Sequence, residues 1–404
     1  MDHQDVIEGV FVPLSKEEVE MEPLSIQELF EKIKQDKNIK VHDMRVPFQK
    51  EIQLNDFALQ SRGQDEDKMY AVYPWYRQYI RRGNTILSRK EPEQSLTYGR
   101  KGFEKFFDLM IEYVQYNLEE IQDFGGLSMG DADTHNGLYD IIFDEAYKAM
   151  ENGLKINVCK LVKANGENAQ ISWIKDVGAW LIASKNVSMM VRDENDLGLY
   201  KGDRFHFAKL IGKEWMRIAQ RIEKEGMIDA LKENMSGRTF VGEYCGNQKY
   251  QHLVKYTEVD IHFVAIVEND QMTTCLPPVE AFAIFEKFNL TRVGLTNVGT
   301  YDNWKVLNQT LKQIYIDVAT AKIDSEEEGS VIYLTKVDET EGRQETVSLA
   351  KLKTLEYRIY RKLREKLRGF IGQVKSDYKP WRDYFERFCK ETEELCRELK
   401  PPKE

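Results

Sequence analysis

Cysteine and long apolar runs are both scarce in this chain of 404 residues. Its five cysteines are odd in number and widely spaced, which argues against a disulfide framework or a zinc site. Reduced thiols of this kind are typical of a cytosolic or nuclear protein. No run of 18 apolar residues occurs, so no transmembrane helix and no membrane partner are expected. The acidic stretch 1–30 has no apolar segment of the kind that a secretory signal needs.

The chain also lacks a basic excess. Its net charge of −10 argues against a protein that coats nucleic acid with its whole surface. The basic residues are instead concentrated in residues 351–368, where eight lysines and arginines accompany only Glu356 and Glu365. Such a stripe suits a local phosphate-binding groove, and it equally suits a solvated helix face. Charge alone leaves both interpretations open.

The composition, with 42% apolar and 31% charged residues, excludes global disorder and predicts two or three packed units. Apolar spacing predicts helices and short strands in a mixed order. The region 268–324 is long and matches no known pattern, although it contains an apparent helix at 279–288. The predicted helices are 26–36, 103–122, 205–234 and 279–288, with a helical pattern from about residue 355 onward. A turn at 82–84 leads into the first of the predicted strands, which are 85–88, 158–162, 169–174, 180–183, 239–244, 261–267, 330–335 and 346–352.

The most informative segment is the sequence Lys-Ala-Asn-Gly at 163–166. It places Lys163 at the end of the apolar strand 158–162, and we expect that strand to lie beside 169–174 and 180–183. A strand end projects an amine into a cleft at a fixed position, and a glycine such as Gly166 lets a ligand approach the backbone. Taken alone, the segment also fits a lysine on a surface hairpin.

Further short motifs follow in a fixed order. They are Ser184-Lys185, Glu243 within a strand, Phe263 in an aromatic strand, Glu-Gly-Ser-Val at 328–331 and Lys-Leu-Lys at 351–353. This order resembles the motif set of the covalent nucleotidyltransferase superfamily. Within it, the chain is most similar to the adenylyltransferase domain of fungal-type tRNA ligases, which share the Lys-Ala-Asn-Gly sequence and a segment like 101–107. The resemblance spans residues 82–357.

The resemblance implies an ATP-dependent RNA ligase that joins a 3′-OH end to a 5′-phosphate end through lysyl-AMP and RNA-adenylate intermediates. ATP and Mg²⁺ or Mn²⁺ would be its cofactors, and RNA its partner. In such enzymes the glutamate-bearing strand holds the ribose hydroxyls and the aromatic strand stacks on adenine. The residues in the matching positions are Lys163 as nucleophile; Gly166, Arg82, Lys185, Glu243, Phe263, Lys351 and Lys353 for the nucleotide; Glu328 for the metal; and Lys101, Lys105, Arg358, Arg361 and Arg364 for RNA.

The chemistry sets its own requirements on these residues. A free lysine is neutral only about one part in two thousand at pH 7, so the site must lower the pKa of Lys163 or neutralise its charge during attack. Lys351 and Lys353 alternate with Leu352, so both are expected on one face of a strand while the leucine enters the core. Two cations on one face suit an α-phosphate. A half-buried strand with a solvated face has the same alternation.

The predicted fold is therefore α+β, with an antiparallel-sheet nucleotidyltransferase (ATP-grasp-like) body in 1–354 and a short all-α C-terminal extension in 355–404. Only 51 residues follow Lys353, and their helical pattern argues against the strand-rich OB-fold of DNA ligases and capping guanylyltransferases. No phosphate-binding loop of the kinase type occurs, so we expect either that separate end-processing enzymes act or that the RNA arrives with its ends ready. The alternative is a catalytically inactive RNA-binding or scaffold protein with the same fold.

Overall fold

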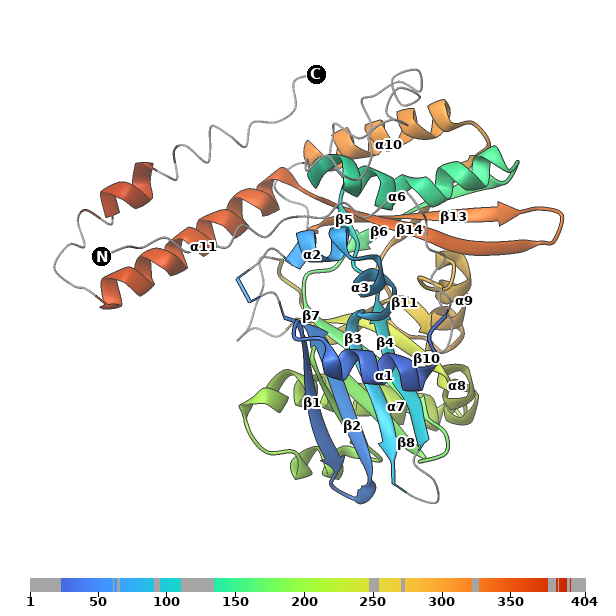
Figure 1. Ribbon diagram of the computed structural model, residues 1–404, viewed down its shortest axis with the longest axis vertical. Helices are drawn as coiled ribbons and strands as arrows, with labels where there is room; N and C mark the ends of the chain where they lie inside the picture. The colour runs from blue at the N-terminus through green and yellow to red at the C-terminus, as the bar shows by residue number, and fades with distance from the viewer. Residues whose placement is uncertain are drawn as a thin grey trace.

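The computed structural model describes residues 23–60, 62–63, 66–90, 95–109, 134–246, 254–269, 273–321, 327–376, 383, 385–390 and 393. Within them the chain forms a mixed α/β structure built on three sheets whose neighbouring strands run almost entirely antiparallel (Figure 1). The first sheet has the order β1 (Ile39–Val46), β2 (Gln49–Leu59), β3 (Arg82–Arg89) and β4 (Ser95–Phe103). The second has the order β11 (Asp260–Glu268), β10 (Arg238–Cys245), β7 (Glu167–Ile174), β8 (Ala179–Ser184) and β9 (Val187–Val191).

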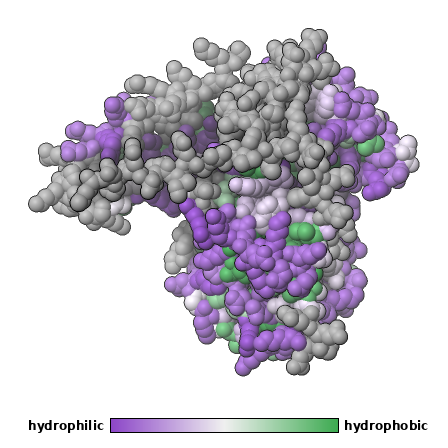
Figure 2. Space-filling view, viewed as in Figure 1, coloured by the Kyte–Doolittle hydropathy of each residue, from purple (hydrophilic) through white to green (hydrophobic). Residues whose placement is uncertain are grey.

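The second sheet lies in the middle of the lower half of the molecule (Figure 1). Helices α7 (His206–Lys224), α8 (Ile228–Met235) and α9 (Pro278–Lys287) pack on one face, where α7 buries an apolar stripe that includes Ile211 and Trp215. The first sheet packs on the other face. Figure 2 shows mainly hydrophilic residues on the outer side of the first sheet, where α1 (Ile26–Gln35) lies. Both faces of the second sheet are thus covered by apolar side chains.

The third sheet has the order β12 (Leu295–Tyr301), β6 (Lys155–Lys163), β13 (Gly329–Asp338), β14 (Arg343–Lys353) and β5 (Phe107–Asp108). Helices α6 (Thr134–Glu151) and α10 (Trp304–Ala319) cover one face, over buried side chains such as Ile332 and Leu352. The opposite face shares its apolar cluster with the second sheet. The two sheets therefore face each other across a common core, and the candidate site lies between them.

Strands β6 and β7 do not pair, so the prediction that 158–162 and 169–174 are neighbours is wrong. Strand β6 pairs with β12 and β13, whereas β7 pairs with β8 and β10. The turn at 164–166 instead carries the chain from the third sheet to the second. A Cβ atom on Gly166 would lie 2.5 Å from the carbonyl oxygen of Tyr244, so the glycine allows β7 to begin close against β10. This close approach to protein backbone accounts for the glycine without a ligand.

Three further sequence predictions need correction. Residues 82–84 are the first part of β3, not a turn. Within the predicted helix 103–122, residues 103–109 are extended, with buried and less buried side chains alternating, and 110–122 lie outside the described residues. The long helix 205–234 is divided by Gly226, whose φ of 74° is a left-handed conformation that favours glycine. Strand β12 and helix α10, both within 268–324, had no recognised signal.

Other predictions agree with the structure. Helix α1 begins at a capping box formed by Ser25 and Glu28 and matches the predicted helix 26–36 closely. Short helices α2 (Glu66–Val72) and α3 (Pro74–Tyr79) lead into β3. Helix α11 (Leu355–Ser376) follows β14 and extends away from the sheets (Figure 1). None of the helices in the described part of the chain has the length and apolar character that crossing a bilayer requires.

Candidate active site

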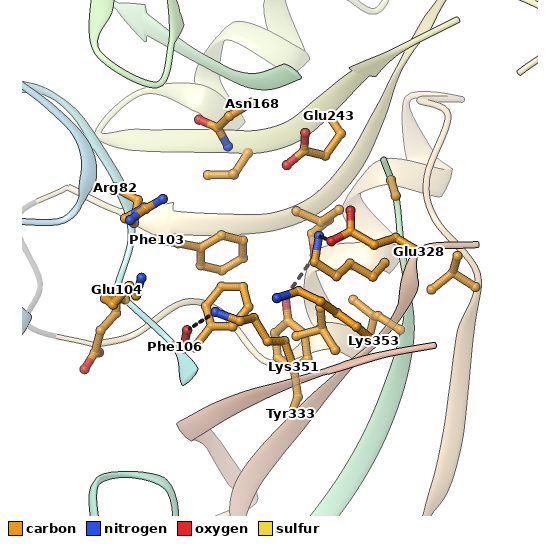
Figure 3. Close-up of a pocket in the computed structure, with 18 of the residues that line it drawn as sticks. Arg82, Phe103, Glu104, Phe106, Asn168, Glu243, Glu328, Tyr333, Lys351 and Lys353 are labelled. Atoms are coloured by element: carbon orange, nitrogen blue, oxygen red, sulfur yellow. Dashed lines mark hydrogen bonds and ion pairs between the residues drawn. The ribbon is translucent and has the colours of Figure 1, made fainter. Parts of the chain in front are cut away.

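A pocket of about 290 Å³ lies between the second and third sheets. Side chains from β3, β4, β6, β10, β13 and β14 line it, together with Lys185 from the turn between β8 and β9 and Arg361 from α11 (Figure 3). Residues far apart in the sequence thus converge on one cavity. Most of the residues predicted from the motifs are among them, as described below.

Lys163 and Glu328 form an ion pair in this pocket. Lys163 is the last residue of β6, and its Nζ atom lies 2.8 Å from Oε1 of Glu328. Sheet register explains the meeting, because Gly329 pairs with Lys163 on one side and with Lys353 on the other. The side chain of Lys163 is 21% exposed and that of Glu328 only 6%. The predicted nucleophile, metal-site carboxylate and second late lysine therefore occupy neighbouring positions.

Asn165 holds the buried carboxylate of Glu328 in place. Its Nδ2 atom donates to Oε2 of Glu328 at 2.8 Å, while its Oδ1 atom accepts a hydrogen bond from the backbone N–H of Val254 at 3.1 Å. A buried charge needs such partners, because an unpaired carboxylate would lose its hydration without compensation. Sequence reasoning gave Asn165 no role. Its place in the Lys-Ala-Asn-Gly motif was the available signal.

Lys351 and Lys353 project from β14 into the pocket, as the alternation of the sequence predicted (Figure 3). Leu352 points to the opposite face, into the core under α6 and α10. The Nζ atom of Lys351 donates to the backbone oxygen of Phe106 at 3.2 Å, and Asp108 of β5 lies 3.2 Å from Lys353. Burial lowers the pKa of Lys351 to about 8, although the charge of Asp108 acts to raise it.

Glu243 lies on the opposite wall of the pocket, on β10 (Figure 3). Burial raises the pKa of its carboxyl to about 8, while the positive charge of Lys163 acts in the other direction. A carboxyl group with this pKa is largely protonated at pH 7, so it can both donate and accept hydrogen bonds. Paired ribose hydroxyls have the same two capacities.

Phe263 does not line the pocket, and the prediction that it stacks on a base is wrong. Its side chain is fully buried under α7 and α9, against Phe240 and Phe285. The next residue, Val264, faces the pocket instead. Alternate residues of a strand face opposite sides, so a misplacement by one residue exchanges a ligand contact for a core residue. The aromatic rings that do line the pocket are Phe103, Phe106 and Tyr333.

A second group of cations lies at the other end of the pocket, where helix α2 supplies their partners. Arg82 forms an ion pair with Glu66 at 2.5 Å, and Lys185 lies 3.9 Å from the same carboxylate. Lys105 pairs with Asp67. Burial lowers the pKa of Lys185, and the charge of Arg82 lowers it further. Arg82 and Lys185, predicted as nucleotide contacts, and Lys105, predicted as an RNA contact, all line the pocket.

The residues predicted to contact RNA separate into three groups. Lys101 is 3% exposed within β4, with its amine 5.8 Å from the ring centre of Tyr98, so the prediction that it contacts RNA is wrong. Arg361 lines the pocket, and it pairs with Glu365 at 3.1 Å. Arg358 is exposed and Arg364 half-buried on α11, outside the pocket lining.

The donor atoms present suit a metal that is bound mainly by phosphate and water. The described residues contain no group of three or more histidine, cysteine, aspartate or glutamate side chains that could hold an ion by themselves. Glu328 supplies one buried, oriented carboxylate that faces the pocket. Mg²⁺ takes few protein carboxylates and keeps most of its ligands as water and phosphate oxygen. The residues therefore fit a magnesium-type ion that arrives with a nucleotide.

Comparison with known proteins gives matches among solved structures alone. No protein-family model matches the chain, and no curated protein sequence matches it significantly. Among solved structures, Naegleria gruberi RNA ligase with PPi is 13% identical, with a TM-score of 0.35 over 79% of this chain and 96% of that one. A lysine-to-alanine mutant of that ligase with ATP and Mn is 12% identical, with a TM-score of 0.35 over 80% of this chain and 98% of that one. Superposition this loose leaves the function to be argued from the pocket itself.

Proposed function

We propose that this protein is an ATP-dependent RNA ligase that seals 3′-OH and 5′-phosphate RNA ends. The observation that carries the proposal is the convergence of Lys163, Glu328, Lys351 and Lys353 on one pocket, with Lys163 and Glu328 only 2.8 Å apart. Lys163 is far in the sequence from the other three residues, and all four match one ordered motif set. A chance set of motifs has no reason to meet in a cavity.

The pocket supplies the groups that lysine adenylylation needs. Nζ of Lys163 attacks the α-phosphorus of ATP, a P–N bond forms, the bond to the β-phosphate breaks and pyrophosphate leaves. The amine must first lose a proton, and Glu328 Oε1 is a carboxylate oxygen within hydrogen-bond distance of it. Lys351 and Lys353 place positive charge beside the reacting phosphate. Glu243 binds the ribose hydroxyls.

The later steps transfer AMP to RNA. The 5′-phosphate of RNA attacks the lysyl-AMP phosphorus, which frees Lys163 and forms an RNA-adenylate. The 3′-OH of the second RNA end then attacks the 5′-phosphate, and AMP leaves as the phosphodiester bond forms. Cations at both ends of the pocket, such as Lys353 and Arg82, suit a sequence of phosphate-bearing substrates.

Glu328 would hold the divalent cation, with the remaining ligands supplied by phosphate oxygens and water. Such an ion, Mg²⁺ or Mn²⁺, supplies positive charge that offsets the charge of the polyphosphate. Asn165 keeps the Glu328 carboxylate oriented toward the pocket. Lys163 and the cation would share this one carboxylate.

The motif branch supports finer assignments as parts of the same proposal. They are a fungal-type tRNA ligase activity, in RNA repair or tRNA splicing, in the cytoplasm or nucleus. Separate enzymes would prepare the RNA ends. The exposed residue Arg358 and its basic neighbours on α11 would contact the RNA backbone, with binding that weakens steeply as salt rises.

The decisive experiment is incubation with each α-labelled nucleoside triphosphate and Mg²⁺, followed by denaturing electrophoresis. The wild-type protein should become labelled from ATP, and Lys163→Ala should abolish the label. Lys175→Ala is the matched control, because Lys175 is exposed, pairs with Glu233 and lies outside the pocket. A wild-type protein that takes no label would favour the alternative, an inactive RNA-binding or scaffold protein with this fold. Labelling that persists in Lys163→Ala would remove Lys163 as the nucleophile.

A further inference from the structure

The first turn of α11 is attached directly to Glu328. The backbone N–H of Thr354 donates to the backbone oxygen of Glu328 at 3.1 Å. Thr354 also caps the helix, because its Oγ1 atom accepts a hydrogen bond from the N–H of Tyr357 at 3.2 Å. Helix α11 therefore begins at a point fixed by the main chain of the pocket carboxylate.

Side chains make a second attachment at the same place. The Nδ2 atom of Asn165, which donates to Glu328, also lies 3.3 Å from the hydroxyl oxygen of Tyr357. Asn165 thus links the Tyr357 hydroxyl to the Glu328 carboxylate. Tyr357 is only 8% exposed, and burial, followed by the charge of Glu328, raises its pKa to about 12. The hydroxyl therefore keeps its proton at ordinary pH, and its oxygen accepts from Asn165.

The two carboxylate oxygens of Glu328 consequently have different surroundings. Oε1 faces Lys163 at 2.8 Å, and Oε2 accepts from Asn165 at 2.8 Å. Rotation of the carboxylate would break both contacts, and Asn165, which also donates to the Tyr357 hydroxyl, opposes that rotation. Arg361, one helical turn after Tyr357, reaches the same pocket. The start of α11 thus behaves as a wall of the site.

We propose that Tyr357 is a positioning residue that, through Asn165, orients Glu328 toward Lys163, so that docking of α11 is a condition for forming the lysyl-AMP bond. The activity part of this inference rests on the function proposed above; the contact itself does not. It places the first turn of α11 in the catalytic unit, beyond the boundary at 354 expected from the sequence. Loss of one hydrogen bond between neutral groups should slow the chemical step by roughly two- to tenfold.

Tyr357→Phe tests the proposal, because it removes the hydroxyl and keeps the ring. We expect the maximal rate of Lys163 adenylylation to fall roughly two- to tenfold, with little change in the KM for ATP, since Tyr357 lies behind Glu328. The matched control is Tyr200→Phe. Tyr200 is also buried, and its hydroxyl donates to the backbone oxygen of Met190 at 2.6 Å, away from the pocket. A merely structural role would make both variants lose stability and rate together.

Hydrogen exchange of the α11 amides supplies a readout that needs no activity. Tyr357→Phe and Glu328→Gln should both speed exchange at residues 355–362, and the double variant should add little to either, because both changes remove a hydrogen-bond partner of Asn165. Tyr200→Phe should leave this segment unchanged. A wild-type protein that takes no label from ATP would refute the proposed function. Hydrogen exchange would still test the contact between Asn165 and Tyr357. Unchanged exchange in Tyr357→Phe, or an unchanged adenylylation rate, would overturn the proposal.

Discussion

Each cation that lines the pocket along β3, β14 and the β8–β9 turn faces a carboxylate from the protein itself. Glu66 serves Arg82 and Lys185, and Asp108 serves Lys351 and Lys353. Phosphate oxygens must compete with these carboxylates for the same N–H groups. The competition lowers affinity for a single phosphate and favours ligands that carry several negative charges. A nucleoside triphosphate and an RNA 5′ end both meet that requirement.

Lys351 gives the pocket a pH limit that can be measured. Its pKa of about 8 means that its charge is lost as the pH rises through 8, so a phosphate bound by that charge should bind more weakly above pH 8. In a Lys163→Ala background, which removes the nucleophile, the Kd for ATP should rise up to about tenfold per pH unit between pH 8 and 9.5. Calorimetric titration at each pH provides the measurement.

Lys351→Arg in the same background should remove this dependence, because arginine keeps its charge throughout the range. Glu243 also has a pKa of about 8, and its ionisation would weaken binding in the same direction. The two origins are distinguishable. A pH dependence that survives Lys351→Arg and disappears in Glu243→Gln would assign the effect to Glu243 and contradict the prediction for Lys351.

Single residues also show where sequence reasoning succeeds. Lys351 and Lys353 were placed correctly because Leu352, between them, is apolar and the alternation is unambiguous. Phe263 was misplaced because its neighbour Val264 is apolar as well, so the sequence does not distinguish the two faces of β11. Asn165 was overlooked because its role is a hydrogen bond to Glu328, which is 163 residues away in the chain.

At the scale of elements, α11 combines two tasks along its length. In its first turns Arg361 lines the pocket and Tyr357 lies behind Glu328, whereas Arg358 is exposed outside the pocket lining. The basic stripe noted in the sequence is thus divided between a pocket-facing part and a solvated part. Periodicity predicted the helix well, and it could not show which turn touches another element.

This division leads to opposite expectations for two arginines of the same helix. Arg361→Ala should raise the KM for ATP in Lys163 adenylylation several-fold, because its guanidinium lines the pocket. Arg358→Ala should leave adenylylation unchanged, weaken RNA binding and reduce the salt dependence of that binding by about one phosphate contact. Filter binding of RNA over a salt series and label transfer from ATP measure the two effects. Equal effects of both variants on adenylylation would contradict the division.

Element boundaries depended on glycine and on neighbouring strands. Gly226 ends α7 with a left-handed φ, and glycine in a long amphipathic pattern was the available warning. The apolar residues in 103–109 have helical spacing. The segment nevertheless contains the end of β4 and the short strand β5, because β5 pairs with the edge of β14. Propensity within a window cannot reveal a partner strand almost 250 residues away.

At the scale of the whole molecule, a buried polar network joins the first and second sheets. Arg100 on β4 is completely buried and donates to Thr85 on β3, to Gln170 on β7 and to the backbone oxygen of Ser184. Asp56 on β2 completes the network by accepting from Ser188. The mixed fold was predictable from the alternation of short strands and helices. This junction was not, because its members are scattered over more than 130 residues.

The network ties the stability of the protein to its pocket, because Lys185 directly follows Ser184. Arg100→Met should lower the free energy of unfolding by about 3–5 kcal/mol, since Asp56 would remain buried without its nearer, fully buried cation, and the half-exposed Arg204 lies 4.0 Å away. It should also weaken ATP binding, because the turn that carries Lys185 loses the hydrogen bond to Arg100. Chemical denaturation and calorimetric titration measure the two effects.

Arg343→Met, which breaks only an exposed pair with Glu341, should cost no more than about 1 kcal/mol. Restoration of stability by Asp56→Asn in the Arg100→Met background would confirm the buried charge as the cause, whereas an unfolding free energy within 1 kcal/mol of wild type in Arg100→Met would refute it.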